Sequence, residues 1–189
     1  MKHFVPLLTI GLLFTFGLTA AGYAVLAVDS PGVGDSSGAP ASNRDAVVAS
    51  VQVWFDWLAT QPEVQTNSIA MLGASIGGLQ ALVGCGAMPE CRTAISLSPP
   101  RDGYGITAEQ VREALETQLR NRSALLLAAT FDGYFTAAVR EMAGWSRGEL
   151  GVYIFRGVGH GEMLFTSFER ADRVIAHILD WLNEHRPSA

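Results

Sequence analysis

The sequence predicts an α/β domain with a doubly wound, mostly parallel sheet of about five recognisable strands and no large lid. Short apolar segments alternate along the chain with segments whose apolar residues recur at helical spacing. The hydrophobic fraction is 49% and there are 20 glycines, a composition that suits a buried sheet with tight turns. A chain of 189 residues is long enough for one such domain and too short for two.

The expected strands are short apolar runs that end at turn-forming residues. Apolar residues on both faces of a run are typical of parallel strands that helices cover on each side. The first run stops at the sequence Asp-Ser-Pro-Gly, and the third stops at Ser-Pro-Pro. The expected strands are Tyr23–Asp29, Ser68–Leu72, Thr93–Leu97, Ala124–Ala129 and Gly151–Phe155.

The segments between and after these strands have the periodicity of helices. Apolar residues recur at helical spacing after Ser42 and Asn43, and each of these two is a suitable N-cap. Thr107, followed three residues later by Gln110, is typical of a capping box at a helix start. The expected helices are Ser42–Thr60, Ile76–Val83, Thr107–Leu119, Tyr134–Ala143 and Phe168–Leu182.

Residues 1–21 form an apolar leader that precedes the expected domain at 22–189. A basic start, an apolar run from Phe4 to Leu18 and the small residues Thr19-Ala20-Ala21 favour a secretory signal peptide. No charged residue lies between Phe4 and Val28, which is also long enough for a membrane anchor. We therefore expect an exported (periplasmic or secreted) or membrane-attached protein. The alternative is a truncation remnant on a cytoplasmic chain.

Charge and cysteine content exclude two classes of function. The net charge is −5 and the 13 Lys and Arg residues form no basic run, so we expect no nucleic-acid partner. Cys85 and Cys91 have neither the spacing nor the neighbouring histidines of a metal site, and we expect no metal. They would form a disulfide in an exported chain or remain two thiols in a reducing compartment.

The segment Gly73-Ala-Ser75-Ile76-Gly77 contains the pattern G-x-S-x-G. It follows a short apolar strand and opens a helix, which is the setting of a nucleophile elbow. We expect side chains at Gly73 and Gly77 to clash with neighbouring backbone, which would explain both glycines. Ser75 would begin a helix, where the Ile76 N–H can donate to a developing oxyanion. The sequence therefore predicts Ser75 as a nucleophile.

A serine hydroxyl needs a base to attack near neutral pH, and His160 is the best placed of four histidines. His160 lies in a glycine-rich loop directly after the last expected strand, at the sheet edge where ligands bind in parallel sheets. His3 lies in the apolar leader. His177 and His185 lie on the last helix, where we expect them to be solvated.

The third member of such a site is a carboxylate that orients the histidine. Asp132 follows the strand immediately before that of His160, and the order Ser75, Asp132, His160 is that of the hydrolases with a nucleophile elbow. Asp102 is the competitor, because it follows the previous strand. For Tyr134 and Trp145, core packing is favoured over a role as pocket walls.

These motifs resemble those of the α/β-hydrolase superfamily, and more closely its dienelactone-hydrolase-like and small bacterial serine-esterase branches. The similarity runs from about Gly22 to the last helix. It implies a catalytic triad of Ser75, Asp132 and His160, with the Ile76 amide in the oxyanion hole. Dienelactone hydrolases proper use a cysteine nucleophile, so Ser75 implies an ordinary esterase. The matching segments are residues 22–36, 73–78, 95–99, 132–134 and 157–161.

Two departures from the family pattern bear on activity. The family normally has earlier strands and a His-Gly loop that supplies the second oxyanion amide, and residues 1–21 contain no His-Gly pair. Loss of one such donor lowers the rate by roughly 100- to 1000-fold. The stretch from Pro99 to Ser123 holds one expected helix, so the site should be open and favour small or soluble esters over long lipids.

The sequence therefore predicts a carboxylester hydrolase that acts through an acyl-serine intermediate on a small-molecule ester and needs no cofactor. The alternative is a catalytically weak or inactive α/β-hydrolase-fold binding protein or fragment. A dinucleotide-binding domain is disfavoured, because Ser37 stands where the pattern begun by Gly32 and Gly34 requires a third glycine.

Overall fold

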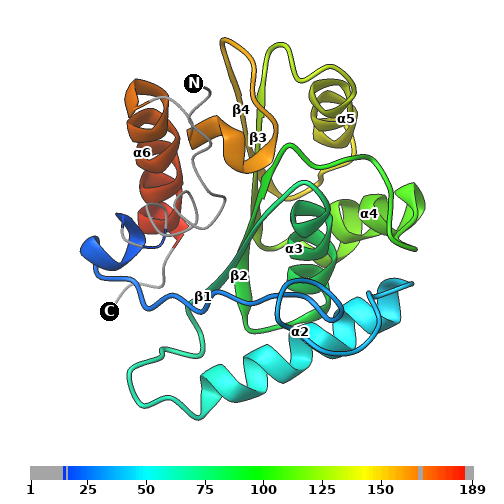
Figure 1. Ribbon diagram of the computed structural model, residues 1–189, viewed down its shortest axis with the longest axis vertical. Coiled ribbons are helices and arrows are strands. Elements are labelled where there is room, and N and C mark those ends of the chain that lie inside the picture. Colours follow the sequence, from blue (N-terminus) through cyan, green and yellow to red (C-terminus); the bar gives the residue numbers. More distant parts are fainter. Residues whose placement is uncertain (1–14, 16, 166–167, 186–189) are drawn as a thin grey trace.

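The computed structural model contains a four-stranded parallel sheet in the order β1-β2-β3-β4, with helices on both faces (Figure 1). It describes residue 15, residues 17–165 and residues 168–185. The predicted α/β class is confirmed. The strands are β1 (Ile69–Ala74), β2 (Cys91–Leu97), β3 (Ser123–Ala129) and β4 (Glu149–Phe155).

All five predicted helices are present, and one of them changes character midway. Asn43 caps the first helix by accepting a hydrogen bond from the Ala46 N–H at 3.0 Å. The Thr107–Gln110 capping box is formed, but the helix that it opens continues as a short π-helical turn, η1. The elements are α2 (Arg44–Ala59), α3 (Ile76–Ala87), α4 (Ala108–Glu113), η1 (Ala114–Gln118), α5 (Tyr134–Ala143), the 3-10 turn η2 (Gly161–Phe165) and α6 (Phe168–His185).

Each face of the sheet has its own apolar core. Successive residues of a strand point to opposite faces, so Leu126 of β3 packs in one cluster and its neighbours Leu125 and Leu127 pack in the other. Side chains of α2, α3, α4, η1 and α5 pack in the first cluster, and side chains of α6 and η2 pack in the second. In Figure 1, α6 accordingly lies on the opposite side of the sheet from α3 and α4.

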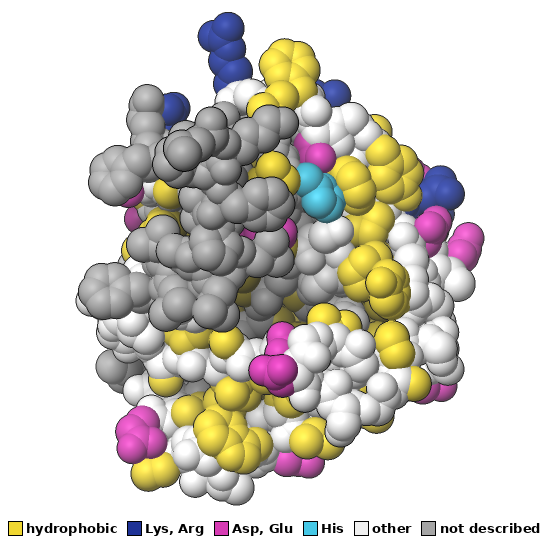
Figure 2. All heavy atoms as spheres, viewed as in Figure 1, with side chains coloured by type: hydrophobic (Ala, Val, Ile, Leu, Met, Phe, Trp, Pro, Cys, Tyr) yellow, Lys and Arg dark blue, Asp and Glu magenta, His cyan; other side chains and the backbone are white. Residues whose placement is uncertain are grey.

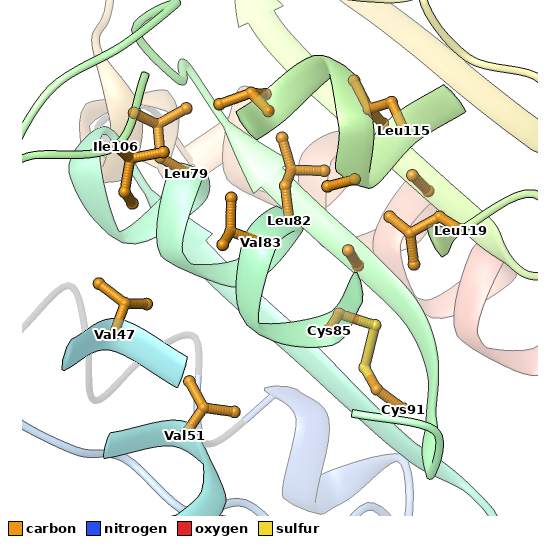
Figure 3. Close-up of a cluster of buried hydrophobic side chains, with 14 of the residues drawn as sticks. Val47, Val51, Leu79, Leu82, Val83, Cys85, Cys91, Ile106, Leu115 and Leu119 are labelled. Carbon is orange, nitrogen blue, oxygen red and sulfur yellow. A yellow bond between two sulfur atoms is a disulfide. The ribbon is translucent and has the colours of Figure 1, made fainter. Parts of the chain in front are cut away.

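A disulfide between Cys85 and Cys91 joins the last turn of α3 to the first residue of β2 (Figure 3). Both residues are buried in the core cluster beneath α2 and α3, where Val51 and Leu82 also lie. Of the two states that the sequence left open, the structure contains the bonded one. The bond closes a short loop behind the helix that carries Ser75 at its other end.

The predicted strand at Tyr23–Asp29 is wrong. The segment is not part of the sheet, and most of its residues are exposed, among them Val25, Leu26 and Val28. Figure 1 shows it as a blue coil that runs from beside α6 towards α2. Apolar β-branched residues form a strand only where another strand accepts their backbone hydrogen bonds. Among the described residues, none of the four strands pairs with this segment.

Most of the predicted leader at 1–21 lies outside the described residues. Its described end is helical at Thr15 and Gly17–Ala20, and Leu18 is buried in the core cluster of α6. A Cβ added at Gly17 would lie 3.5 Å from the Ile175 side chain of α6, so this turn rests on that helix. Within the described residues, no helix is both long and apolar enough to cross a membrane.

Candidate active site

Three loops at the carboxyl edge of the sheet carry the predicted site residues. Ser75 directly follows β1, Asp132 lies in the turn after β3, and His160 lies in the loop after β4. All neighbouring strands are parallel, so these loops emerge at the same edge. The fold therefore gathers residues that are far apart in the chain.

Ser75 occupies a strained turn between β1 and α3. Its φ of 54° and ψ of −122° are unfavourable for a residue with a side chain, a state that persists only where surrounding structure enforces it. Its N–H donates to the Leu97 carbonyl of β2 at 2.8 Å, and its own carbonyl accepts from the Gly78 N–H at 2.9 Å. The turn is thus held from both the sheet and the helix.

The expectation that both glycines of the G-x-S-x-G pattern avoid clashes is right for only one of them. A Cβ at Gly73 would lie 2.0 Å from the Gly77 carbonyl oxygen, so β1 and the first turn of α3 approach too closely for a side chain. A Cβ at Gly77 would meet nothing within 4 Å. The Gly77 carbonyl thus restricts position 73, whereas position 77 has room for a side chain. Gly78 is the second crowded position, since its Cβ would lie 2.4 Å from Ser96 Oγ.

His160 bridges Ser75 and Asp132. Its Nε2 lies 2.9 Å from Ser75 Oγ, and its Nδ1 lies 3.2 Å and 3.1 Å from the two carboxylate oxygens of Asp132. In the tautomer that these partners favour, Nδ1–H donates to the carboxylate and Nε2 accepts from the serine hydroxyl. The Asp132 side chain is 8% exposed and that of His160 is 31% exposed, so the carboxylate is sheltered while the imidazole is open to solvent.

The loop that carries His160 depends on glycines with positive φ. Gly157, Gly159 and Gly161 have φ values of 126°, 143° and 55°, which side-chain-bearing residues rarely adopt. A Cβ at Gly161 would lie 3.2 Å from the Ala74 Cβ, so the loop rests directly against the serine turn. This close approach positions the imidazole near Ser75.

An aromatic side chain that the sequence did not nominate packs against the His160 imidazole. The Phe135 ring lies 3.9 Å from the His160 ring between centroids, tilted by 46°. Tyr134 contacts Phe135 edge-on at 5.3 Å, and its hydroxyl accepts a hydrogen bond from the Arg101 N–H at 3.2 Å. Tyr134 is 54% exposed, so its predicted core role is wrong, whereas Trp145 does pack against the core. The signal in the sequence was the position of Phe135, three residues after Asp132.

The remaining candidate residues lie elsewhere. Asp102 forms an ion pair with Arg101 at 3.4 Å and has no hydrogen bond to His160. The prediction that both histidines of α6 are solvated is wrong for His185, whose side chain is 11% exposed, while His177 is half-buried. His177 lies 3.9 Å from the Tyr153 ring, and His185 stacks on Trp181 at 4.0 Å while bridging to Glu149 at 3.2 Å.

Ile76 begins α3 directly after Ser75, as expected for the oxyanion donor. We find no hydrogen-bond acceptor for its backbone N–H among the described residues. The first turn of a helix leaves such amides unpaired, which suits them to a developing negative charge. Among the described residues, no group of three or more His, Cys, Asp or Glu side chains is arranged to hold a metal ion.

The fold and this site define an α/β-hydrolase: a parallel sheet, a serine in a strained strand-to-helix turn, and a histidine and a carboxylate at the same edge. The chain belongs to the X-Pro dipeptidyl-peptidase (S15) family, whose family model matches residues 9–149. A comparison with curated proteins finds no match.

Solved structures with similar folds include three hydrolases, each at most 20% identical in sequence. The esterase domain of a Rhodothermus marinus protein is 17% identical with a TM-score of 0.74, and the match covers 98% of this chain and 82% of that one. A monoacylglycerol lipase from Paleococcus ferrophilus is 17% identical with a TM-score of 0.73, and the match covers 94% of this chain and 89% of the lipase. The dienelactone hydrolase from Anabaena variabilis is 20% identical with a TM-score of 0.59. The match covers 76% of this chain and 60% of that enzyme, so this chain spans less than two thirds of the enzyme's length.

Proposed function

We propose that this protein is a serine hydrolase that cleaves carboxylic esters of small or soluble compounds through an acyl-serine intermediate. The observation that carries the proposal is the unbroken contact series from the Asp132 carboxylate through His160 to the Ser75 hydroxyl. A hydroxyl hydrogen-bonded to a neutral imidazole, which a buried carboxylate orients, is the arrangement that makes serine nucleophilic.

The proposed reaction has two stages. Ser75 Oγ attacks the ester carbonyl carbon while its proton passes to His160 Nε2. This attack produces a tetrahedral intermediate. The bond to the alcohol oxygen then breaks, His160 returns the proton to that oxygen, and the alcohol leaves an acyl-serine. Water next attacks the acyl carbon and gives a proton to His160, which returns it to Ser75 Oγ as the carboxylic acid departs.

The Ile76 N–H would stabilise the negative oxygen of each tetrahedral intermediate. A backbone donor at the start of a helix is already oriented, so it needs no rearrangement as the charge develops. This assignment is supported by the position of Ile76 directly after the serine and by the lack of an acceptor for its N–H among the described residues.

The test is covalent labelling of the purified full chain with a fluorophosphonate probe. We expect wild type to be labelled at Ser75 and Ser75→Ala not to be labelled. Ser50→Ala is a matched control, because the Ser50 hydroxyl of α2 donates to the Ala46 carbonyl within its own helix. Labelling that persists in Ser75→Ala would overturn the proposal. An unlabelled wild type with an intact circular dichroism spectrum would favour an inactive binding protein.

The family match favours a second candidate, cleavage of a dipeptide from a peptide with proline in its second position. The same triad could attack an amide, but the amine is a poorer leaving group and demands more transition-state stabilisation. An assay that compares Ala-Pro-p-nitroanilide with p-nitrophenyl esters of rising chain length separates the two. We expect the short esters to have the higher kcat/KM. Preference for the anilide would assign the peptidase activity instead.

We also propose that the chain works outside the reducing cytoplasm. The buried Cys85–Cys91 disulfide supports this, since such bonds persist mainly in oxidising compartments. Cells expressing the protein can be lysed into a thiol-alkylating reagent that adds mass to each free cysteine. Mass spectrometry should then find the two cysteines unmodified. Alkylation of both in freshly lysed cells would contradict the proposed location.

A further inference from the structure

Several large apolar side chains are exposed around His160, among them one in each of the loops after β3 and β4 and one at the start of α5. Phe131, Tyr134 and Val158 are 69%, 54% and 65% exposed, and we call these three residues the rim. Single exposed apolar residues are ordinary on protein surfaces, but several together beside a reactive site are typical of a ligand contact. Figure 2 shows a histidine at the surface of one face of the molecule with hydrophobic side chains directly beside it.

Backbone and ring contacts join the rim to the base. The Phe131 N–H donates to the Gly157 carbonyl at 3.0 Å, which places Phe131 next to the loop that carries Val158 and His160. On the other side of Asp132, Tyr134 contacts Phe135, whose ring contacts the imidazole. The rim therefore belongs to the turns that hold Asp132 and His160 and to the first residue of α5.

Arg101, whose backbone contacts Tyr134 of the rim, has acidic partners of its own. The Arg101 N–H binds the Tyr134 hydroxyl, while its guanidinium forms ion pairs with Asp102 at 3.4 Å and Glu141 at 3.8 Å. A guanidinium with two acidic partners has little net attraction for an anionic substrate. The three rim side chains carry no charge themselves, so the rim suits an apolar group.

We propose that the rim binds the leaving alcohol, and that the substrates are esters of an apolar, uncharged alcohol that carries a ring or a branched chain. This rests on the proposed function, because it depends on proton transfer from His160 to the leaving oxygen. The leaving oxygen takes its proton from His160 Nε2, so the alcohol portion must lie closer to the residues around His160 than the acyl portion does. Apolar contact there stabilises the transition state through a part of the substrate that does not react.

The test compares two ester series with the full-length protein by pH-stat titration. One series keeps acetate and changes the alcohol from ethanol to butanol and benzyl alcohol. The other keeps ethanol and changes the acid from acetate to butyrate and phenylacetate. Burial of a benzyl group against the rim should raise kcat/KM about tenfold from ethyl to benzyl acetate, and more than the matching change in the acid.

Rim variants connect the selectivity to these residues. Phe131→Ala and Tyr134→Ala should each reduce the benzyl-to-ethyl ratio to about twofold, whereas Tyr134→Phe, which keeps the ring, should retain it. Trp57→Ala on α2 removes a similarly exposed aromatic side chain, 51% exposed, and should leave the ratio unchanged. A ratio that Phe131→Ala and Tyr134→Ala do not alter, or a larger effect of the acid than of the alcohol, would overturn the rim proposal alone. A wild type inactive on every ester would overturn the proposed function and the rim proposal with it.

Discussion

The Nε2 atom of His160 lies 2.9 Å from Ser75 Oγ, although 85 positions of the chain separate the two residues. The contact is made at the carboxyl edge of the sheet, where the loop after β4 rests on the turn after β1 through Gly161 and Ala74. The contact therefore depends on the parallel pairing that brings the ends of β1 and β4 to one edge of the sheet.

Replacement of the carboxylate should remove most activity without unfolding the protein. Asp132→Asn no longer holds the imidazole in the reactive tautomer, and we expect kcat to fall about 10³- to 10⁴-fold. Asp102→Asn is the matched control, since Asp102 pairs with Arg101 in an exposed ion pair and should leave kcat within about twofold. Initial-rate kinetics on a p-nitrophenyl ester would measure both. Equal losses in the two variants would exclude Asp132 as the orienting acid.

The Phe135 ring should act as a positioning residue for His160. The glycine-rich loop allows the imidazole alternative orientations, and the packed ring restricts them. In Phe135→Leu we expect kcat to fall about tenfold with little change in KM, because bound substrate is attacked less often. Phe135→Tyr keeps the ring and should restore most of the rate. A parallel rise in KM, or no recovery in Phe135→Tyr, would indicate a general packing role instead.

The two glycines that flank Ser75 should differ sharply on substitution. Gly73→Ala forces a Cβ against the Gly77 carbonyl oxygen and should lower the free energy of unfolding by about 3 kcal/mol or more. In Gly77→Ala the added Cβ meets no neighbour and alanine replaces a helical glycine. The free energy of unfolding should therefore stay the same or rise by up to about 1 kcal/mol. Urea denaturation of both variants gives the comparison. A Gly73→Ala protein as stable as wild type would show that the turn can open.

Loss of the disulfide should lower stability and spare the chemistry. The bond joins residues six positions apart, and the chain-entropy estimate for so short a loop is about 2 kcal/mol. We expect the double variant Cys85→Ala, Cys91→Ala to lose about that much free energy of unfolding, measured by urea denaturation. Its kcat, normalised to the amount of Ser75 that the fluorophosphonate probe labels, should stay within about twofold of wild type. Wild type under reducing conditions should match the variant. A large loss of kcat at full folding would instead connect the bond to the position of Ser75.

Arg122 should contribute more to stability than an ordinary surface arginine. Burial lowers the pKa of its guanidinium, with a smaller contribution from the nearby charge of Arg92. Arg122→Met would leave several buried carbonyls without a donor, and we expect a loss of about 3 kcal/mol in urea denaturation. Arg122→Lys should recover only part of this lost free energy of unfolding, since an ammonium group cannot reproduce the several planar N–H donors of the guanidinium. The guanidinium donates to the carbonyls of Cys85, Gly86, Met88, Cys91 and Gln118.

Local sequence determined the helices and the four central strands. Helical periodicity, the Asn43 cap and the capping box at Thr107 are properties of neighbouring residues, and the structure contains each of them. The loops after β1, β3 and β4 carry Ser75, Asp132 and His160, which the order of elements was enough to nominate. Because parallel strands place their carboxyl ends at one edge, sequence order alone indicated which side chains could meet.

Other features depended on which segments become neighbours, and only the tertiary structure decided them. Tyr23–Asp29 has the composition of a buried strand, but strand formation requires a partner, and none of the described strands pairs with it. Gly73 and Gly77 look equivalent in the motif, but only Gly73 faces opposing backbone. The contact of Phe135 with His160 joins the start of α5 to the loop after β4. Periodicity reports how one segment is built, whereas pairing, crowding and ring contacts depend on distances between segments remote in the chain.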